Sequence, residues 1–269
     1  MIKKLVIICF IIYNNLLFSE VINLKLPAFG EYGYYHELLK KSLEAEGYNV
    51  RITELPKECE QKRVMGMMRA DSEQITLTWA IQTEERDREF VPIEEGITNG
   101  LIGNRILLIP KESQNEYNRI KNIEDFKKLG KVGGFGKGWF DIKIWEYNGL
   151  KTYEKDGSWD PEIYRMVASK NRGIDYFSRG AHEIAAESRK YPELDVEKRI
   201  LFVYDKDMRF YLTKSNKNLK PILEKAIQNA KKKGIMDNEL KKYYPELYDK
   251  SKFDIENRIK IKLKLPKSI

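Results

Sequence analysis

The chain has 269 residues, of which 42% are hydrophobic and 33% are charged, with 49 basic and 41 acidic side chains. Charges of both signs are interspersed, so the formal excess of +8 is diffuse. A nucleic-acid-binding protein usually concentrates its basic residues on one face, so we expect no nucleic-acid partner. A mild positive field instead favours anionic ligands over cations.

The N-terminus has the pattern of a signal peptide. Lys3 and Lys4 precede the apolar run Leu5–Tyr13, which is short for a membrane span, and the residues up to Ser19 fit a cleavage site. We expect residues 1–19 to be removed and the mature chain to be periplasmic or otherwise extracytoplasmic. The alternative is an uncleaved membrane anchor. Removal leaves 47 basic and 41 acidic residues, a formal charge of +6.

Cysteine and histidine usage limits the chemistry. Cys9 lies in the leader, so the mature chain keeps Cys59 alone and cannot form an internal disulfide. Its stability must come from a hydrophobic core, and about 250 residues allow one large or two small domains. His36 and His182 are far apart in sequence, so we expect no metal site, no cofactor and no catalytic triad.

The first half of the mature chain alternates strands and helices. Strands are predicted at 21–27, 48–55, 76–79 and 104–110, and helices at 34–45 and 57–70. The strand–helix–strand start implies a parallel pair with a right-handed crossover. Ligands of such sheets bind at the carboxyl ends of strands, which places Tyr34 and Tyr35, with Tyr32 and His36, near any pocket. For each tyrosine, packing against the helix start is the alternative.

The stretch Thr76–Pro92 organises the rest of the chain. After its strand, Thr83 caps a short helix, and Glu84 and Glu85 occupy the first turn, where carboxylates suit the helix dipole. Arg86 follows, placed to reach back over the loop. The combination of a strand end, a short helix and an arginine is typical of an anion-binding site. The alternative is a solvated cluster of surface charges.

The second half repeats the alternation. Residues 131–138 (KVGGFGKG) predict a strand that turns into glycines before a helix at 139–147, and amides at a helix start attract anions. The spacing lacks a nucleotide-binding motif. GIDYF at 173–177 predicts a strand that runs into Ser178-Arg179-Gly180. The other predicted strands are 149–153, 200–203, 209–213 and 258–265, and the other helices are 160–169, 181–190, 218–233 and 235–244.

These elements, from Asn23 to Tyr248, resemble the bacterial extracellular solute-binding proteins of family 3, the polar amino-acid type, in a divergent branch. The resemblance rests on TWAIQTEERDREFVPI, NRILLIP, KVGGFGKG, GIDYF and NLKPILEKAIQNAKKKGIMDNELKKYY. It implies an α/β fold of the type II periplasmic-binding-protein class, two lobes joined by two hinge strands. Lobe 1 would comprise 20–106 and 205–249, lobe 2 would comprise 107–204, and 250–269 would be a basic tail or peripheral strand.

The resemblance also implies ligand-binding residues. Thr83 to Arg86 matches the T-x-x-R motif whose arginine holds an α-carboxylate, and Trp79 and Ala80 occupy the place of residues that meet the amino group. The second-lobe turn that offers amides to the carboxylate is matched by Gly136, Lys137, Gly138 and Trp139. The family usually places an aspartate after a strand like GIDYF. Here Arg179 and its neighbours stand there instead, which departs from the pattern for a standard α-amino acid.

The expected function is a monomeric binding protein that captures a small anionic or amino-acid-like ligand and delivers it to an ABC transporter permease. Arg86 and Arg179 would hold the ligand from opposite lobes, and Trp79, Trp139 and a tyrosine would cover its apolar part. As alternatives, Arg179 pairs with Glu183 and Trp139 belongs to the core. The rival functions are a ligand-sensing module for a receptor and a cyclohexadienyl-dehydratase-like enzyme using His182 with Glu183.

Overall fold

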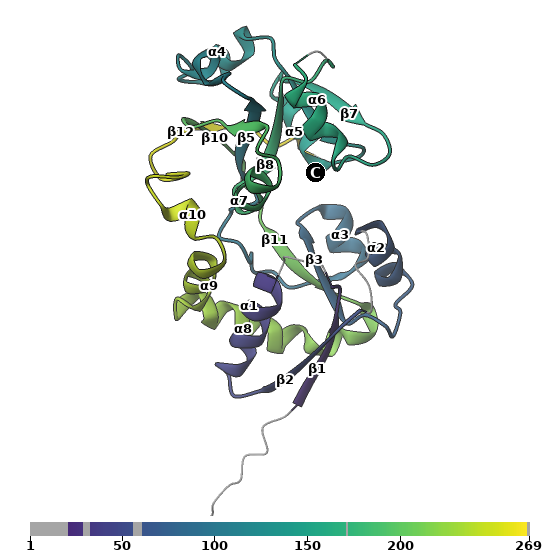
Figure 1. The fold of residues 1–269 in the computed structure, drawn as a ribbon. Coiled ribbons are helices and arrows are strands. Elements are labelled where there is room, and N and C mark those ends of the chain that lie inside the picture. Colours follow the sequence, from purple (N-terminus) through teal and green to yellow (C-terminus); the bar gives the residue numbers. More distant parts are fainter. Residues whose placement is uncertain (1–20, 29–32, 56–60, 171, 268–269) are drawn as a thin grey trace, which may run out of the picture.

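The computed structural model describes residues 21–28, 33–55, 61–170 and 172–267. The leader, Tyr32 and Cys59 therefore lie outside the described residues. Two groups of α/β elements stand one above the other, and we call the group that contains the first strand lobe 1 and the other lobe 2 (Figure 1). Among the described residues no helix has both the length and the hydropathy to cross a membrane.

Lobe 1 contains two small sheets. Strands β1 and β2 pair in parallel, which confirms the predicted parallel pair, and β11 lies between β3 and β4 in an antiparallel sheet. The Thr76 amide donates to the Lys25 carbonyl over 2.8 Å, which joins the two sheets. The elements are β1 (Val21–Leu26), α1 (Gly33–Glu44), β2 (Asn49–Glu54), α2 (Gln61–Arg69), β3 (Leu77–Ile81), α3 (Glu84–Glu89), β4 (Val91–Pro92), β11 (Met208–Leu212), η2 (Lys214–Leu219), α8 (Lys220–Lys232), α9 (Ile235–Tyr243) and α10 (Pro245–Tyr248).

Lobe 2 is built on one mixed sheet. Its strand order is β12-β10-β5-β8-β6-β7, and β9 also pairs with β5. The elements are β5 (Asn104–Pro110), η1 (Gln114–Tyr117), α4 (Ile123–Lys128), β6 (Val132–Gly136), α5 (Phe140–Tyr147), β7 (Lys151–Lys155), α6 (Glu162–Ala168), β8 (Tyr176–Gly180), α7 (Ala181–Lys190), β9 (Leu194–Val196), β10 (Ile200–Val203) and β12 (Ile259–Lys262).

Strand β8 differs from its prediction. We expected a strand at 173–177, but β8 begins at Tyr176 and continues to Gly180 because Arg179 pairs with Ile106 of β5. The carboxylate of Asp175 accepts the Val132 amide over 2.8 Å and so belongs to the preceding turn. Successive strand residues point to opposite faces, so this register puts Arg179 and Ser178 on opposite sides of the sheet.

The described chain crosses between the lobes three times, at 93–103, at 204–207 and again after α10. The first two crossings touch. The carboxylate of Asp207 accepts the amides of Thr98 and Gly100 at 3.1 and 3.0 Å. A Cβ atom on Gly103 would overlap the carbonyl oxygen of Tyr204. Side-chain acceptors and a required glycine therefore fix how the two segments lie against each other.

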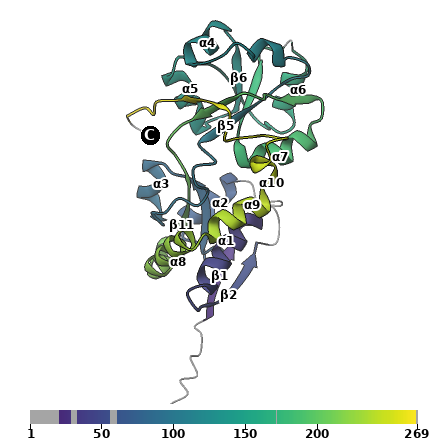
Figure 2. The ribbon, with the colours of Figure 1, turned by 90° about the vertical axis from the view of Figure 1, so that its left-hand side faces the viewer.

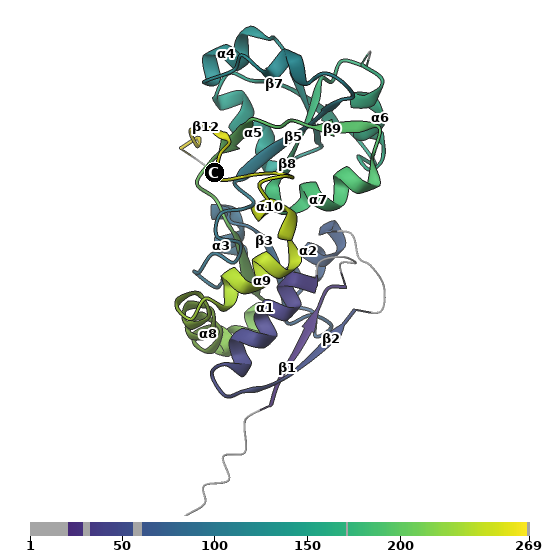
Figure 3. The ribbon, with the colours of Figure 1, turned by 60° about the vertical axis from the view of Figure 1, so that its left-hand side comes forward.

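Residues 245–263 form the third link, which we call the C-terminal strap. Its helix α10 lies between α9 of lobe 1 and α7 of lobe 2 (Figures 2 and 3). Leu247 and Ile255 are buried in an apolar cluster that includes residues of both lobes. Arg258, 6% exposed, donates to the Glu197 and Ile200 carbonyls at 2.6 and 3.0 Å. Strand β12 then pairs in parallel with β10, so the C-terminal segment is an edge strand of lobe 2.

Candidate functional site

The turn between β3 and α3 positions the first arginine. Thr83 has extended backbone angles and its Oγ1 accepts the Arg86 amide over 3.2 Å, which is the geometry of an N-cap. The Arg86 side chain folds back over the same turn, and its Nη1 donates to the Ile81 carbonyl over 2.7 Å. The cap that the sequence indicated at Thr83 is therefore present, and it holds Arg86 at the end of β3.

Arg86 is a half-buried cation without a carboxylate partner within the described ranges. Burial lowers its pKa, whereas the nearby Tyr211 and Glu85 oppose that shift. A guanidinium has five N–H donors, and its one hydrogen bond to a carbonyl leaves donors for another acceptor. Charge-assisted, bidentate contacts with a carboxylate would satisfy them. The geometry thus suits an anionic group at this strand end.

The predicted site residues Tyr34, Tyr35, Trp79 and Ala80 of lobe 1 are core residues in this conformation. Tyr34 and Tyr35 are each 1% exposed, and the Tyr34 hydroxyl donates to the Ile97 carbonyl over 2.6 Å. The ring of Trp79 stacks on Tyr35 with centroids 4.7 Å apart, and Ala80 is fully buried. The expectation that Tyr34 and Tyr35 line a pocket is therefore corrected here to the packing alternative.

The glycine turn of lobe 2 is already occupied by protein acceptors. The Lys137 amide donates to the Lys155 carbonyl over 3.0 Å, and the Gly138 amide donates to Glu154 Oε1 over 3.1 Å. The Lys137 ammonium pairs with the Asp156 carboxylate, which follows the neighbouring parallel strand β7. Gly136 admits no Cβ because the Trp139 indole nitrogen would lie 2.5 Å from it. These glycines let Trp139 fold back, and the predicted anion-binding amides are engaged within the protein.

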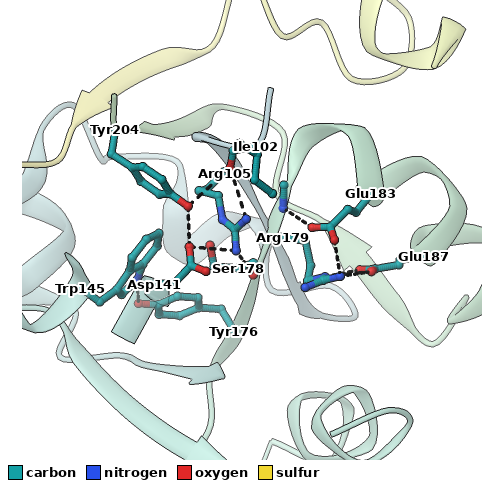
Figure 4. Close-up of polar contacts among 11 residues, drawn as sticks. Ile102, Arg105, Asp141, Trp145, Tyr176, Ser178, Arg179, Glu183, Glu187 and Tyr204 are labelled. Carbon is teal, nitrogen blue, oxygen red and sulfur yellow. Dashed lines mark hydrogen bonds and ion pairs between the residues drawn. The ribbon is translucent and has the colours of Figure 1, made fainter. Parts of the chain in front are cut away.

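Arg179 has a different set of partners from those of Arg86. Its Nε donates to both carboxylate oxygens of Glu187 at 2.8 Å, and its Nη2 donates to Glu183 Oε1 at 2.8 Å (Figure 4). The guanidinium also lies 5.1 Å from the ring centroids of Trp139, Trp159 and Phe177. The alternative in which Arg179 pairs with Glu183 is therefore confirmed.

The Arg179 cluster is not a free cationic site. One guanidinium is shared by two carboxylates, whose side chains keep 15% and 14% exposure at Glu183 and Glu187. Burial alone would lower the pKa of Arg179, but these two carboxylates raise it well above its usual value. Burial raises the pKa of Glu187, against the effect of Arg179. The two carboxylates would therefore repel an anion that approached Arg179, whereas they would attract an ammonium group.

Gly180 explains how Glu183 reaches the end of the strand. The Glu183 Oε2 accepts the Gly180 amide over 2.9 Å, and a Cβ on Gly180 would lie 2.9 Å from the same oxygen. Only one half of a capping box forms, because glycine has no side chain that could accept the Glu183 amide. A Glu three residues after a helix N-cap is still a signal that could have placed this carboxylate from the sequence. Sequence reasoning missed Glu187 and Trp159 altogether.

His182, the candidate acid of an enzyme, is 4% exposed, and its Nδ1 has no hydrogen-bond partner within the described residues. Burial lowers its pKa. Its ring meets Tyr244 edge-on at 5.7 Å, a contact between α7 and the end of α9. A neutral, packed imidazole contributes to the contact between the lobes. In the described part of the chain no group of three His, Cys, Asp or Glu side chains is arranged to hold a metal ion.

Neither a family model nor a curated protein matches the sequence. Solved structures do match: an ancestral arginine-binding protein bound to arginine is 18% identical, with a TM-score of 0.55 over 82% of this chain and 98% of that chain. An amino acid ABC transporter substrate-binding protein from Streptococcus pneumoniae, bound to L-arginine, is 17% identical, with a TM-score of 0.56 over 83% and 94%.

The chain has the type II periplasmic-binding-protein fold. A third neighbour of this fold is an ancestral amino-acid-binding protein described as a precursor of cyclohexadienyl dehydratase. It is 13% identical, with a TM-score of 0.57 over 82% of this chain and 95% of that chain. Identities this low establish the architecture alone, and they confirm the expected resemblance at that level.

Proposed function

We propose that this protein is an extracytoplasmic solute-binding protein that captures a small amino-acid-like ligand between its lobes and delivers it to an ABC transporter permease. The observation that carries the proposal is the difference between its two arginines. Within the part of the chain that the structure describes, Arg86 in lobe 1 has no carboxylate partner, whereas Arg179 in lobe 2 pairs with two carboxylates. A ligand that carries a carboxylate and an ammonium group would complement Arg86 with the first group and the Arg179 cluster with the second.

The ligand would bind with its carboxylate on Arg86 and its cationic group near Glu183 and Glu187. Thr83 would keep Arg86 in position through the cap, and the partly exposed rings of Trp139 and Trp159 would cover apolar atoms. A ligand that contacts both lobes shifts their equilibrium by its differential affinity for the closed arrangement. The permease would recognise this closed arrangement of the lobes. Two of the neighbours named above are described as bound to arginine.

Replacement of Arg86 tests the proposal. In a thermal-shift screen of arginine, lysine, glutamine and succinate, at least one zwitterionic compound should stabilise the unaltered protein. Arg86→Ala should lose that stabilisation while keeping its fold, because losing one partner of a buried charged contact costs about 2–5 kcal/mol. The matched control is Arg88→Ala on the same helix, whose side chain is 74% exposed; it should bind normally. Equal stabilisation of both variants would remove Arg86 from the site.

A lyase activity is the second candidate, favoured by the neighbour described as a dehydratase precursor. Such a reaction requires a general acid poised in the site, and His182 is buried with a lowered pKa while Glu183 is paired with Arg179. These observations favour binding. Incubation with cyclic carboxylic acids and product analysis separates the two, since a binder gives stoichiometric heat without product.

A further inference from the structure

A cavity of about 420 Å³ lies where the chain passes between the lobes, apart from Arg86 and Arg179. All three crossing segments contribute to its wall, and its polar lining residues are Asn99, Asn104, Tyr204, Asp205, Lys206 and Lys262. Its volume is in the range of small-molecule sites. We call it the hinge pocket.

The hinge pocket is built at the ends of three paired strands. Val203 of β10 is in register with Asn104 of β5 on one side and with Lys262 of β12 on the other. The Leu263 amide donates to the Val203 carbonyl over 2.8 Å, which extends this pairing to the pocket rim. The lining groups therefore come from segments whose spacing is fixed by backbone hydrogen bonds. The backbone positions of the lining are therefore set before any ligand binds.

The charge of the pocket favours an anion. Lys206 and Lys262 contribute two positive charges against the one negative charge of Asp205. Lys206 lies 5.5 Å from the ring centroid of Phe140, and burial lowers its pKa. Outside the lining, the carboxylates of Asp87 and Glu84 favour the charged form of Lys206, and the guanidinium of Arg209 opposes it.

Two lining groups have hydrogen-bonding capacity to spare. Within the described residues, neither the Asn104 side-chain amide nor the Lys262 ammonium has a hydrogen-bond or ion-pair partner. Ammonium and amide N–H groups are the donors that oxyanions accept. A compact anion could therefore contact donors from the start of β5 and from the strap together, with Lys206 beside it.

We propose that the hinge pocket binds a small divalent oxyanion, such as inorganic phosphate or a short dicarboxylate, separately from the ligand captured between the lobes. Because the pocket wall joins the first crossing, the second crossing and the strap, an anion there ties the three segments together. Its binding would favour one angle between the lobes by the difference in its affinity for the two arrangements.

The test measures phosphate and succinate binding to the full chain by calorimetry and thermal shift, against sodium chloride of equal ionic strength. At a tenfold excess over Kd, we expect Tm to rise by about 2–5 °C. Lys262→Gln should weaken binding at least about tenfold, since it removes one charge-assisted contact. Lys260→Gln, two residues away on the same strand and outside the pocket lining, is the matched control and should bind like the unaltered protein.

Two further outcomes separate this site from the proposed ligand site. Phosphate or succinate binding that survives Arg86→Ala but not Lys262→Gln supports the hinge pocket, and the preference between the two probes identifies the anion. Binding that disappears with Arg86→Ala, that weakens equally in Lys260→Gln, or that is matched by chloride overturns the proposal. Because the proposed function is judged by the zwitterionic compounds arginine, lysine and glutamine, and the hinge pocket by phosphate and succinate, either idea can fail without deciding the other.

Discussion

Asp141→Asn is expected to be among the most damaging single substitutions of lobe 2. The Arg105 Nη2 lies 3.0 Å from Asp141 Oδ1, and the two side chains are 2% and 10% exposed (Figure 4). The other contacts of this guanidinium are long, at 3.3 Å to the Ile102 carbonyl and 3.4 Å to the Ser178 carbonyl. Its Nε has no partner within the described residues. Asp141 therefore supplies most of what stabilises the buried charge.

The expected magnitude follows from removing one charge of a buried pair. An uncompensated buried guanidinium costs about 3–5 kcal/mol, a large share of the roughly 5–15 kcal/mol that typical domains possess. Tyr204→Phe removes the 2.7 Å hydrogen bond from that hydroxyl to Asp141 Oδ1 and its 3.5 Å contact with the Ile102 carbonyl, so its cost should be about 1.5–3 kcal/mol. Arg105→Met with Asp141→Leu removes both charges and should be more stable than Asp141→Asn alone.

Urea titration, followed by circular dichroism and by tryptophan fluorescence, measures these differences. Trp145 reports locally, because its ring centroid lies 6.4 Å from that of Tyr204. The two signals must change together for the free energies to be comparable. A loss below about 1 kcal/mol for Asp141→Asn, or a double variant no more stable than Asp141→Asn, would refute the reasoning, since the guanidinium would then be solvated.

Two further predictions concern Gly103 in the first crossing and His182 where α7 meets the end of α9. Gly103→Ala places a Cβ against the Tyr204 carbonyl, which cannot move aside as a side chain could, so we expect a loss of about 1–3 kcal/mol or more in urea titration. Gly66→Ala, a helical position with open space, should instead gain about 0.5–1 kcal/mol; similar losses at both sites would contradict the overlap. For His182, whose folded pKa is lowered, the unfolded chain binds more protons below its usual pKa of about 6.5. Stability should therefore fall as pH drops below that value, by at most about 1.4 kcal/mol per pH unit, and His182→Gln should flatten the slope of unfolding free energy against pH between 5 and 7. The groups that act on His182 are Glu183, Arg105, Arg179, Asp207 and Tyr244.

The sequence predicts most elements and the local geometry of one arginine. The pattern of Thr83, two acidic residues and Arg86 predicts a helix cap that depends only on contacts within one turn. The structure contains that cap. Strand 104–110 and helix 181–190 were also predicted with the observed bounds. In these segments local propensity and hydrophobic pattern agree with the tertiary structure.

The environment of Arg179 could not be predicted in the same way. Its main partner, Glu187, is eight residues ahead on another element, and this contact exists only because β8 runs to Gly180 before α7 folds over it. Trp159 lies between predicted elements, so no periodicity marked it. The burial of Tyr35 depends likewise on Trp79, more than forty residues away in sequence. Strand register and tertiary packing decide these contacts, and neither is encoded in a short sequence window.

The C-terminal strap has a consequence for how the empty protein behaves. When only a fraction of molecules is competent to bind, the apparent Kd exceeds the intrinsic one by the inverse of that fraction. The strap packs against both lobes at α10 and pairs with lobe 2 at β12, which restricts the movement of one lobe relative to the other. If the protein binds a ligand as proposed, its unliganded population would already resemble the liganded one, and opening would lower the apparent affinity less. A transporter that received this ligand would then have a smaller difference in shape by which to distinguish the two states.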